Sequence, residues 1–187
     1  MSTPDVHPGY ASFWRRAGAG ILDVLLLLPI GFFAQWIGTT SRTGALAAAV
    51  LTAVLFWGYT LCFHALRGQT PGKMIAGIHV VRADGRRIGW RESWMRNLVD
   101  LALALVVLAG AFVALGRISG AEYTVLGASR ETEWLDEITP RWARVAETLN
   151  LVWICGGMLV MLLNERRRAI HDFIGGTIVV ERRSAPS

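Results

Sequence analysis

The sequence is poor in charged residues. Only 18% of its 187 residues carry a charge, whereas about 25% do in a typical soluble domain. Hydrophobic residues make up 53% of the chain, and the mean hydropathy is +0.41. This shortage of charge excludes an ordinary soluble domain and favours a protein with several membrane-spanning segments. The eight tryptophans fit that class, because indole rings favour the membrane–water interfaces.

Cysteine is also rare, and several kinds of motif are missing. Cys62 and Cys155 lie in apolar runs without a Cys-x-x-Cys pair or a neighbouring histidine, so we expect packing residues rather than metal ligands or redox groups. The first apolar run contains Asp23 and is followed by no small-x-small cleavage site, which predicts a retained anchor rather than a signal peptide. The net charge is +5, but the sequence contains no motif for nucleic-acid recognition, and we expect no nucleic-acid partner.

Four apolar runs predict membrane-spanning helices, at about residues 17–37, 45–66, 98–115 and 149–163. At about 1.5 Å per helical residue, the first run reaches roughly 30 Å, the thickness of the hydrocarbon core. The last helix is expected to begin at Thr139-Pro140, because threonine is a common N-cap and proline is common in the first turn. These runs predict an all-α membrane protein, a bundle of four transmembrane helices.

The loops differ in charge. The segments that precede the first span, join the second to the third and follow the fourth are rich in arginine and lysine, whereas the other two loops are sparse or acidic. The positive-inside rule therefore predicts a cell-membrane protein with both termini in the cytoplasm. The acidic insertion at residues 117–139 is then extracytoplasmic, and residues 1–13 and 183–187 are interpreted as short tails.

Small residues mark faces on which helices can pack closely. The second span carries Ala45, Ala49 and Ala53 at a small-xxx-small spacing, and the third span carries Gly110 and Ala114. Such faces let two membrane helices bring their backbones together. We expect both faces to pack against neighbouring helices.

A small sheet is expected at the cytoplasmic membrane surface. The β-prone run Ile78–Arg82 is followed by Asp84-Gly85, a strong signal for a hairpin turn. A return strand is expected from Arg86 to Gly89, giving a hairpin over residues 77–89. The tail from Gly176 to Glu181 is β-prone as well, and we predict that it pairs with this hairpin.

The first span contains one charge, Asp23, around which we expect the chain to be arranged. Asp23 follows Arg16 by two helical turns on the same face, about 10 Å deeper along the axis. A carboxylate near the centre of a membrane helix costs about 2.5–3.5 kcal/mol, so it should face protein or water and have a partner. We predict that Arg16 is that partner, and that Ala19 and Gly20 between them let a second helix approach closely.

The segment Gly68-Gln69-Thr70-Pro71-Gly72-Lys73 looks like a phosphate loop but has the wrong spacing. A P-loop has four residues between its first glycine and the Gly-Lys pair, followed by serine or threonine. Here three residues intervene and Met74 follows. We therefore expect a tight turn with a lysine at the headgroup level and no bound ATP.

His171 and Asp172 follow three consecutive arginines, residues 166–168. Adjacent residues on a helix point in different directions and rarely share a metal ion, and no further ligands lie nearby in the sequence. The plain interpretation is a surface turn held by polar bonds. A polar cluster with Arg16 and Asp23 is the alternative.

Two other polar sites near the membrane edge are interpreted as structural. His64, near the end of the second span, is expected to be a membrane-edge polar residue rather than a ligand. Asp100 stands one helical turn after Arg96, where we expect an ion pair at the mouth of the helix rather than a second functional carboxylate.

In combination, these blocks resemble the RDD family of integral membrane proteins, which is named for one arginine and two aspartates. The resemblance covers about residues 13–182 and rests on Arg16-x-x-Ala19-x-x-x-Asp23, Gly68–Lys73, Gly77–Val81 with Asp84-Gly85, Arg96-Asn97, and Arg166–Asp172 with Gly176-Thr177 and Val179-Val180.

The resemblance implies that Arg16 and Asp23 are the family's arginine and first aspartate, and that Asp172 is its second aspartate. The supporting motif residues are Ala19, Gly68, Thr70, Pro71, Gly72, Lys73, Arg96 and Thr177. It also implies a bacterial membrane protein of a kind usually described in terms of transport. The long acidic insertion and Asp100 depart from the family pattern.

Two classes of function remain open. The first is transport of a small ion or solute, in which Asp23 alternates between Arg16 and a bound proton or cation while His171 and Asp172 line the cytoplasmic entry. Four helices are few for a transporter, so this hypothesis implies a homo-oligomer. The second is a non-transporting scaffold or accessory subunit that binds other membrane proteins in the lipid bilayer, with Arg16–Asp23 as a structural pair.

An enzyme is the third class of function, and the sequence gives it little support. It contains no nucleophile motif, metal set or cofactor loop. We expect no catalytic residue, no metal and no cofactor.

Overall fold

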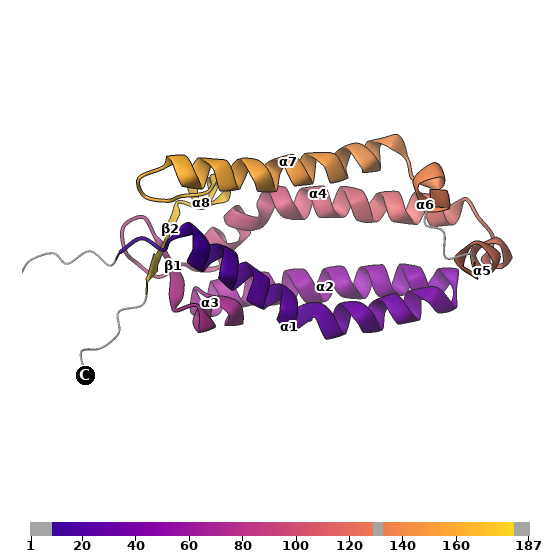
Figure 1. The fold of residues 1–187 in the computed structure, drawn as a ribbon, viewed down its shortest axis with the longest axis horizontal. Coiled ribbons are helices and arrows are strands. Elements are labelled where there is room, and N and C mark those ends of the chain that lie inside the picture. Colours follow the sequence, from indigo (N-terminus) through magenta and orange to yellow (C-terminus); the bar gives the residue numbers. More distant parts are fainter. Residues whose placement is uncertain (1–8, 129–132, 182–187) are drawn as a thin grey trace, which may run out of the picture. The chain divides into compact units, whose positions relative to one another are not determined.

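The computed structural model describes residues 9–128 and 133–181. Residues 1–8 of the predicted N-terminal tail, residues 129–132 of the insertion and the predicted tail at 183–187 lie outside the described residues. In chain order (Figure 1), the elements are α1 (Phe13–Thr40), α2 (Arg42–Arg67), α3 (Pro71–Ile75), β1 (Ile78–Arg82), α4 (Trp90–Gly116), α5 (Gly120–Ala128), α6 (Glu133–Ile138), α7 (Arg141–Leu163), α8 (Ile170–Ile174) and β2 (Thr177–Glu181).

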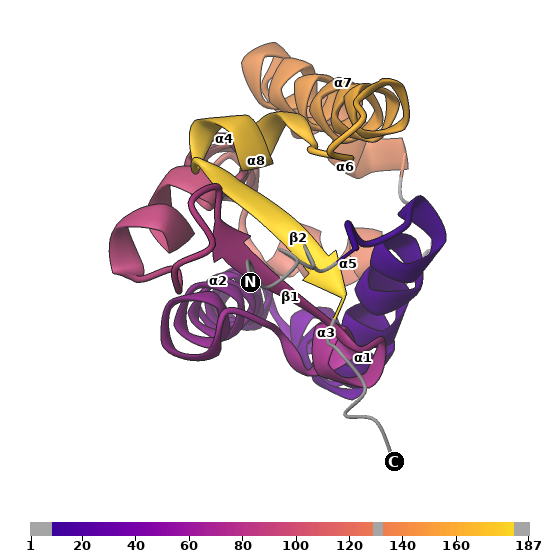
Figure 2. The same ribbon diagram turned by 90° about the vertical axis from the view of Figure 1, so that its left-hand side faces the viewer.

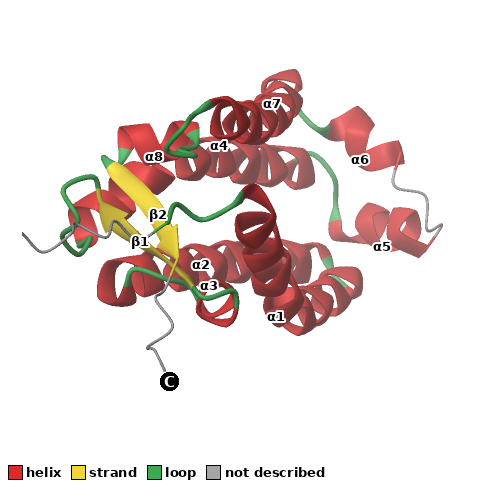
Figure 3. Cartoon of the chain, turned by 60° about the vertical axis from the view of Figure 1, so that its left-hand side comes forward, coloured by secondary structure: helices red, strands yellow, loops and turns green. Residues whose placement is uncertain are grey.

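Four of these helices, α1, α2, α4 and α7, are long and apolar enough to cross a membrane. Their large apolar side chains are widely exposed; on α1, for example, Ile21, Phe32 and Trp36 are each more than half exposed. Such a surface suits lipid and would be a liability in water. The predicted all-α membrane bundle with a small β element is therefore confirmed (Figure 3).

The helices begin before the apolar runs that predict them. The first begins at Phe13 rather than about residue 17, and the third begins at Trp90 rather than about residue 98. The polar residues before each apolar run belong to the same helix, because they continue its backbone hydrogen bonds. A hydropathy pattern does not detect them, because they are not apolar. The last long helix begins at Arg141, directly after the predicted Thr139-Pro140 start.

The chain divides into two compact units, and each long helix contributes one end to each unit. The first unit holds the residues up to 26, residues 59–97 and the residues from 156 onward, and the second holds residues 27–58 and 98–155. The first unit contains α3, α8 and both strands, together with every residue that the sequence analysis assigns to a site.

A two-stranded antiparallel sheet lies at the centre of the first unit. β1 pairs with β2 as predicted, in a register that sets Val80 opposite Val179. Figure 2 looks onto these strands, with α3 and α8 beside them. Residues 9–11, predicted as part of a tail, are attached to β2 by an isolated bridge, in which the Ala11 N–H donates to the Val179 carbonyl at 3.0 Å. The buried core around the sheet consists of Ala11, Ala19, Ile78, Val80, Ile88 and Val179.

The return strand predicted at residues 86–89 does not form. The turn is present, with Gly85 at a φ of 83°, but it is followed by a single bridge to β1. One group that competes with a return strand for hydrogen bonds to β1 is the carbonyl of Gly68, which accepts from the Val80 N–H at 2.8 Å. The other is Glu92, whose carboxylate accepts from the Gly89 N–H at 2.9 Å and so caps the start of α4.

The second unit contains two short helices, α5 and α6, that the sequence analysis does not predict. Tyr123 of α5 donates from its hydroxyl to the carbonyl of Gly38 at 2.6 Å. The close packing predicted at Gly110 is confirmed, because a Cβ there would collide with the Cβ of Ala143. α4 and α7 therefore contact each other at this glycine.

Candidate functional site

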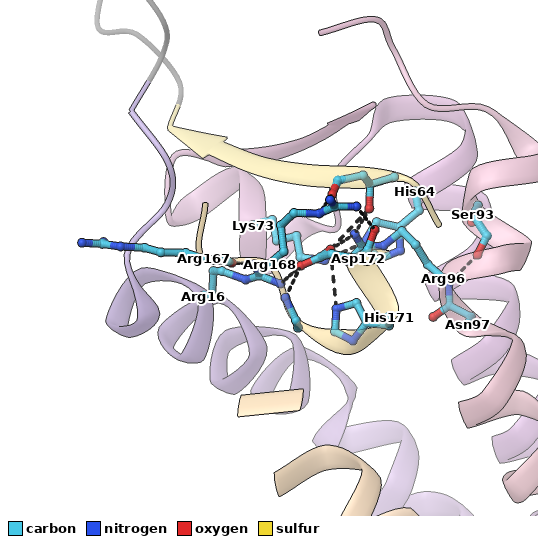
Figure 4. A network of polar contacts seen from close by, with 12 residues as sticks. Arg16, His64, Lys73, Ser93, Arg96, Asn97, Arg167, Arg168, His171 and Asp172 are labelled. Carbon is cyan, nitrogen blue, oxygen red and sulfur yellow. Dashed lines mark hydrogen bonds and ion pairs between the residues drawn. The ribbon is translucent and has the colours of Figure 1, made fainter. Parts of the chain in front are cut away.

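Asp172 is the centre of a polar network in the first unit (Figure 4). Its side chain is fully buried, and a guanidinium group approaches each of its oxygens. Arg16 donates from Nη2 to Oδ2 at 2.6 Å, and Arg96 donates from Nη1 to Oδ1. The same Arg96 nitrogen donates to the hydroxyl of Thr177 at 2.6 Å. One carboxylate therefore links α1, α4, α8 and the start of β2.

The sequence around Asp172 explains why α8 places the carboxylate there. Asp172 is the third residue of the helix, and its Oδ2 accepts from the N–H of Ala169 at 2.9 Å, which caps the N-terminus. Arg168 donates to the carbonyls of Asp172 and Thr177, each at 3.1 Å. Arg167 has a φ of 48°, and its carbonyl accepts from Arg16 at 2.7 Å. The arginine run is therefore part of the network.

Asp23 has a separate set of partners. Its Oδ1 accepts from the hydroxyl of Tyr59 at 2.5 Å and from the N–H of Gly72 at 2.7 Å, and its Oδ2 accepts from the hydroxyl of Thr70 at 2.5 Å. Thr70 precedes α3 and Pro71 opens it. Proline suits this position because no N–H is required there, and the next N–H, that of Gly72, then reaches the carboxylate.

The absence of a side chain at Gly72 permits this contact. A Cβ at Gly72 would collide with the carbonyl of Ala19 and would lie 2.7 Å from the carboxyl carbon of Asp23. Ala19 itself has no solvent exposure. The close approach predicted at Ala19 is thus present, but it is made by the short helix α3 rather than by another long helix. The segment that looks like a phosphate loop holds the carboxylate of Asp23.

The predicted ion pair between Arg16 and Asp23 is wrong. Arg16 contacts Asp172 and the carbonyl of Arg167, while the partners of Asp23 among the described residues are three uncharged donors. Two helical turns separate Arg16 from Asp23 by about 10 Å along the axis, and α8 brings a closer carboxylate from a distant part of the chain. The alternative interpretation of Asp172, as part of a polar cluster with Arg16, is the one that the structure supports.

Lys73 and His64 form a second, partly buried contact in this unit. Lys73 Nζ lies 2.5 Å from His64 Nε2. His64 is only 4% exposed, so its ring is buried within the protein near the end of the second span. Of the 19 lysines and arginines in the chain, Lys73 is the only lysine, and within the described residues no carboxylate lies at ion-pair distance from it. The single lysine, which can give up its proton as an arginine cannot, therefore has no direct counter-ion among the described residues.

Arg16 and Arg96 lower the pKa of both Lys73 and Asp172, which disfavours the charged form of the lysine and favours the charged form of the aspartate. Burial, and then repulsion from Arg96 and Arg16, lower the pKa of Lys73 to about 7, although Asp172 and Asp23 partly offset this. Burial alone would raise the pKa of Asp172, but attraction to Arg96 and Arg16 holds that pKa well below its usual range. Asp172 is therefore ionised near neutral pH, where Lys73 can gain or lose its proton.

His171 lies beside Asp172, with its Nε2 3.7 Å from Oδ1. Burial, followed by repulsion from Arg96, lowers the pKa of His171 to about 3, against about 6.5 for an ordinary histidine. As the pH falls below about 6.5, the unfolded chain takes up this proton and the folded chain does not. Stability associated with neutral His171 is therefore lost progressively between about pH 6.5 and pH 3.

We expect His171→Gln to show a smaller fall in melting temperature on acidification than the unchanged protein, because glutamine has no proton to take up. The measurement is a pair of thermal scans in detergent at about pH 7 and about pH 5.5, a window that spans the pKa of an ordinary histidine and ends about one unit above that of ordinary carboxylates. An equal fall in both proteins would show that His171 is not held neutral by its surroundings.

Tyr59 is not among the residues predicted from the sequence, and no contacts were predicted for Thr70 and Thr177. Tyr59 does carry a signal, because a tyrosine within an apolar span needs a partner for its hydroxyl. The packing role expected for Cys62 and Cys155 is wrong, because both are free and exposed on their helices. Cysteine is often buried, but in a helix that faces lipid an exposed cysteine is not penalised as it would be in water.

The fold and the network define an integral membrane protein with four spanning helices, in which a buried carboxylate and two arginines join helix ends to a small sheet. The model of the RDD family matches residues 10–176. The chain belongs to the RDD family, as its motifs predict. Comparison with curated proteins and with solved structures gave no match in either set.

Proposed function

We propose that this protein is a small carrier that couples the movement of a cation to that of a proton, with Lys73 and His64 as the proton-exchanging pair. The observation that carries the proposal is the 2.5 Å contact between Lys73 Nζ and His64 Nε2. Within the described residues, no carboxylate pairs directly with this lysine. A lysine in such a place can become uncharged, which an arginine cannot.

The neighbouring charges set the direction of coupling. When Lys73 is protonated, it adds a positive charge to those of Arg16 and Arg96, and the three together repel an incoming cation. When Lys73 is neutral, that repulsion is smaller. Loss of the proton and entry of the cation therefore favour each other, as they do in a carrier that exchanges the two.

The two aspartates have supporting roles in this proposal. Hydrogen bonds from the protein hold both carboxylates, that of Asp23 through Tyr59, Thr70 and Gly72, and that of Asp172 mainly through its two arginines. Asp23 is therefore not poised to alternate between Arg16 and a bound ion, as the sequence-based hypothesis requires. Its role is to position α3, and with it Lys73.

The charge of the loops supports a place in the cell membrane with both termini in the cytoplasm. In that orientation Lys73 follows the second span at the cytoplasmic edge of the bilayer. Four helices leave little room for an enclosed path through one chain, so the proposal includes a homo-oligomer.

The test is proton flux into proteoliposomes that contain a pH-sensitive dye, driven by a sodium or potassium gradient. The unchanged protein should show coupled flux that changes steeply around the Lys73 pKa of about 7. Lys73→Arg should abolish coupling because arginine keeps its charge, and Lys73→Met should abolish it because methionine carries no proton. Arg91→Met, which removes an exposed charge in the same unit, is the control and should retain flux.

Two results would overturn the carrier proposal. One is coupled flux in Lys73→Arg with an unchanged dependence on pH. The other is no flux in the unchanged protein under either gradient.

A scaffold or accessory subunit is the second candidate, and it is favoured by the number of protein donors that hold Asp23 and Asp172. Such an arrangement is what a purely structural network requires. For a scaffold, Asp23→Asn should lower the yield of folded and assembled protein, and no variant should alter ion flux. A pull-down in mild detergent should then recover a membrane protein in fixed proportion, and its absence would argue against this candidate.

A further inference from the structure

A cavity of about 720 Å³ lies within the second unit and shares no residue with the Lys73 site. Residues of α1, α2, α4 and α7 wall it, with one each from α5 and α6. Ala45, Ala49 and Ala53 are among the lining residues. The sequence predicts that these alanines form a close-packing face. In this unit they line the cavity, and Ala45 also lies close to α1, because a Cβ at Gly38 would be 3.7 Å from its Cα.

Glu147 of α7 is the one acidic residue in the cavity lining. Asn150 stands one turn later on the same face, and Gln35 and Thr52 add polar groups from α1 and α2. Most of the remaining lining is apolar. The site is thus a partly open, mainly apolar cavity with a carboxylate and neutral polar groups in its lining.

Within the described residues, no basic side chain lines the cavity or forms an ion pair with Glu147. The lining contains no lysine, arginine or histidine, and within the described residues Glu147 makes no ion pair or side-chain hydrogen bond. Arg144, one turn earlier on α7, lines a different groove together with Arg141. Glu147 is exposed and precedes the apolar run at about residues 149–163, so its carboxylate is accessible to a ligand in the cavity.

We propose that this cavity binds a lipophilic cation, a molecule whose positive group meets Glu147 and whose apolar body fills the alanine-lined space. The volume falls in the range of about 300–1,000 Å³ that is usual for small-molecule sites, and apolar walls with a few polar groups are the usual lining. A bare metal ion fits less well, since Ca²⁺ for example takes about six to eight oxygen ligands.

The experiment is equilibrium binding of radiolabelled tetraphenylphosphonium to the full chain in lipid nanodiscs. Glu147→Gln should weaken binding at least about tenfold, which corresponds to about 1.4 kcal/mol, because it removes the charge and almost no volume. Ala111→Phe, which fills part of the cavity without changing charge, should also weaken it. Glu165→Gln removes an exposed carboxylate outside the lining and should leave affinity unchanged.

Two related probes separate charge from apolar shape. Tetraphenylborate has the shape of the cation but the opposite charge and should not bind saturably, and choline has the charge without the large apolar body and should bind much more weakly. Equal affinity of the unchanged protein and Glu147→Gln, equal binding of the two tetraphenyl ions, or no saturable binding would each overturn the proposal. Lys73→Arg should bind the probe normally, so this proposal and the carrier proposal can fail separately.

Discussion

Asp172→Asn is expected to lower the free energy of unfolding by about 3–5 kcal/mol, because removing one partner of a buried ion pair leaves the other charge uncompensated. In this protein two guanidinium groups, those of Arg16 and Arg96, share one fully buried carboxylate. Asparagine can accept a hydrogen bond but neutralises neither charge. The free energy of unfolding of a folded domain is only about 5–15 kcal/mol, so this one substitution should remove a large part of it.

The matched control is Asp84→Asn, which removes the same charge from an exposed turn. Asp84 lies 3.6 Å from Arg82 and 4.0 Å from Arg86, and all three side chains are largely exposed. Exposed ion pairs contribute about 0–1 kcal/mol, so the control should unfold almost as the unchanged protein does. Both variants are compared by unfolding in detergent. Equal stability of the two variants would mean that the Asp172 network does not hold the first unit together.

Gly72→Ala is expected to destabilise the protein by at least about 1–3 kcal/mol, because added volume in a closely packed place forces the backbone to shift. The new Cβ would meet the carbonyl of Ala19 and the carboxyl carbon of Asp23, and backbone atoms cannot yield as a flexible side chain does. The N–H of Gly72 would then move away from Asp23, and Lys73 would move with it. We therefore expect coupled flux to fall together with stability.

Gly18→Ala is the control for this prediction, because it should raise stability where Gly72→Ala lowers it. Gly18 lies within α1, and a Cβ there meets nothing within 4 Å. Alanine stabilises an open helical position by up to about 1 kcal/mol relative to glycine. The melting temperature should therefore be lower for Gly72→Ala than for the unchanged protein, and equal or higher for Gly18→Ala. A Gly72→Ala variant as stable as Gly18→Ala would show that α3 does not press against α1.

Features that depend on composition and local pattern could be predicted from the sequence. The four spans follow from apolar runs whose length matches the bilayer. The strand at Ile78–Arg82 and its pairing with the C-terminal strand follow from β-prone runs near a strong turn signal. The return strand failed because Gly68 and Glu92, which lie outside that local pattern, take hydrogen-bonding groups on this edge.

Partners that are distant along the chain could not be assigned in the same way. Arg16 and Asp23 share a helix face, and this local proximity suggested a pair, but residue spacing says nothing of where α8 lies. The donors to Asp23 come from two other elements, and only Tyr59 gave a hint of its need for a partner. Glu147 was overlooked because its importance depends on a cavity that several helices enclose.

The pairing of Arg16 is tested most directly by two double-mutant cycles measured by unfolding in one detergent system. Arg16→Gln is combined with Asp172→Asn in one cycle and with Asp23→Asn in the other. Residues in one ion-pair network couple by about 0.5–3 kcal/mol, whereas distant residues without shared partners are additive within about 0.5 kcal/mol. We expect coupling in the Asp172 cycle and additivity in the Asp23 cycle. Coupling of Arg16 to Asp23 with additivity toward Asp172 would contradict this structure of the site.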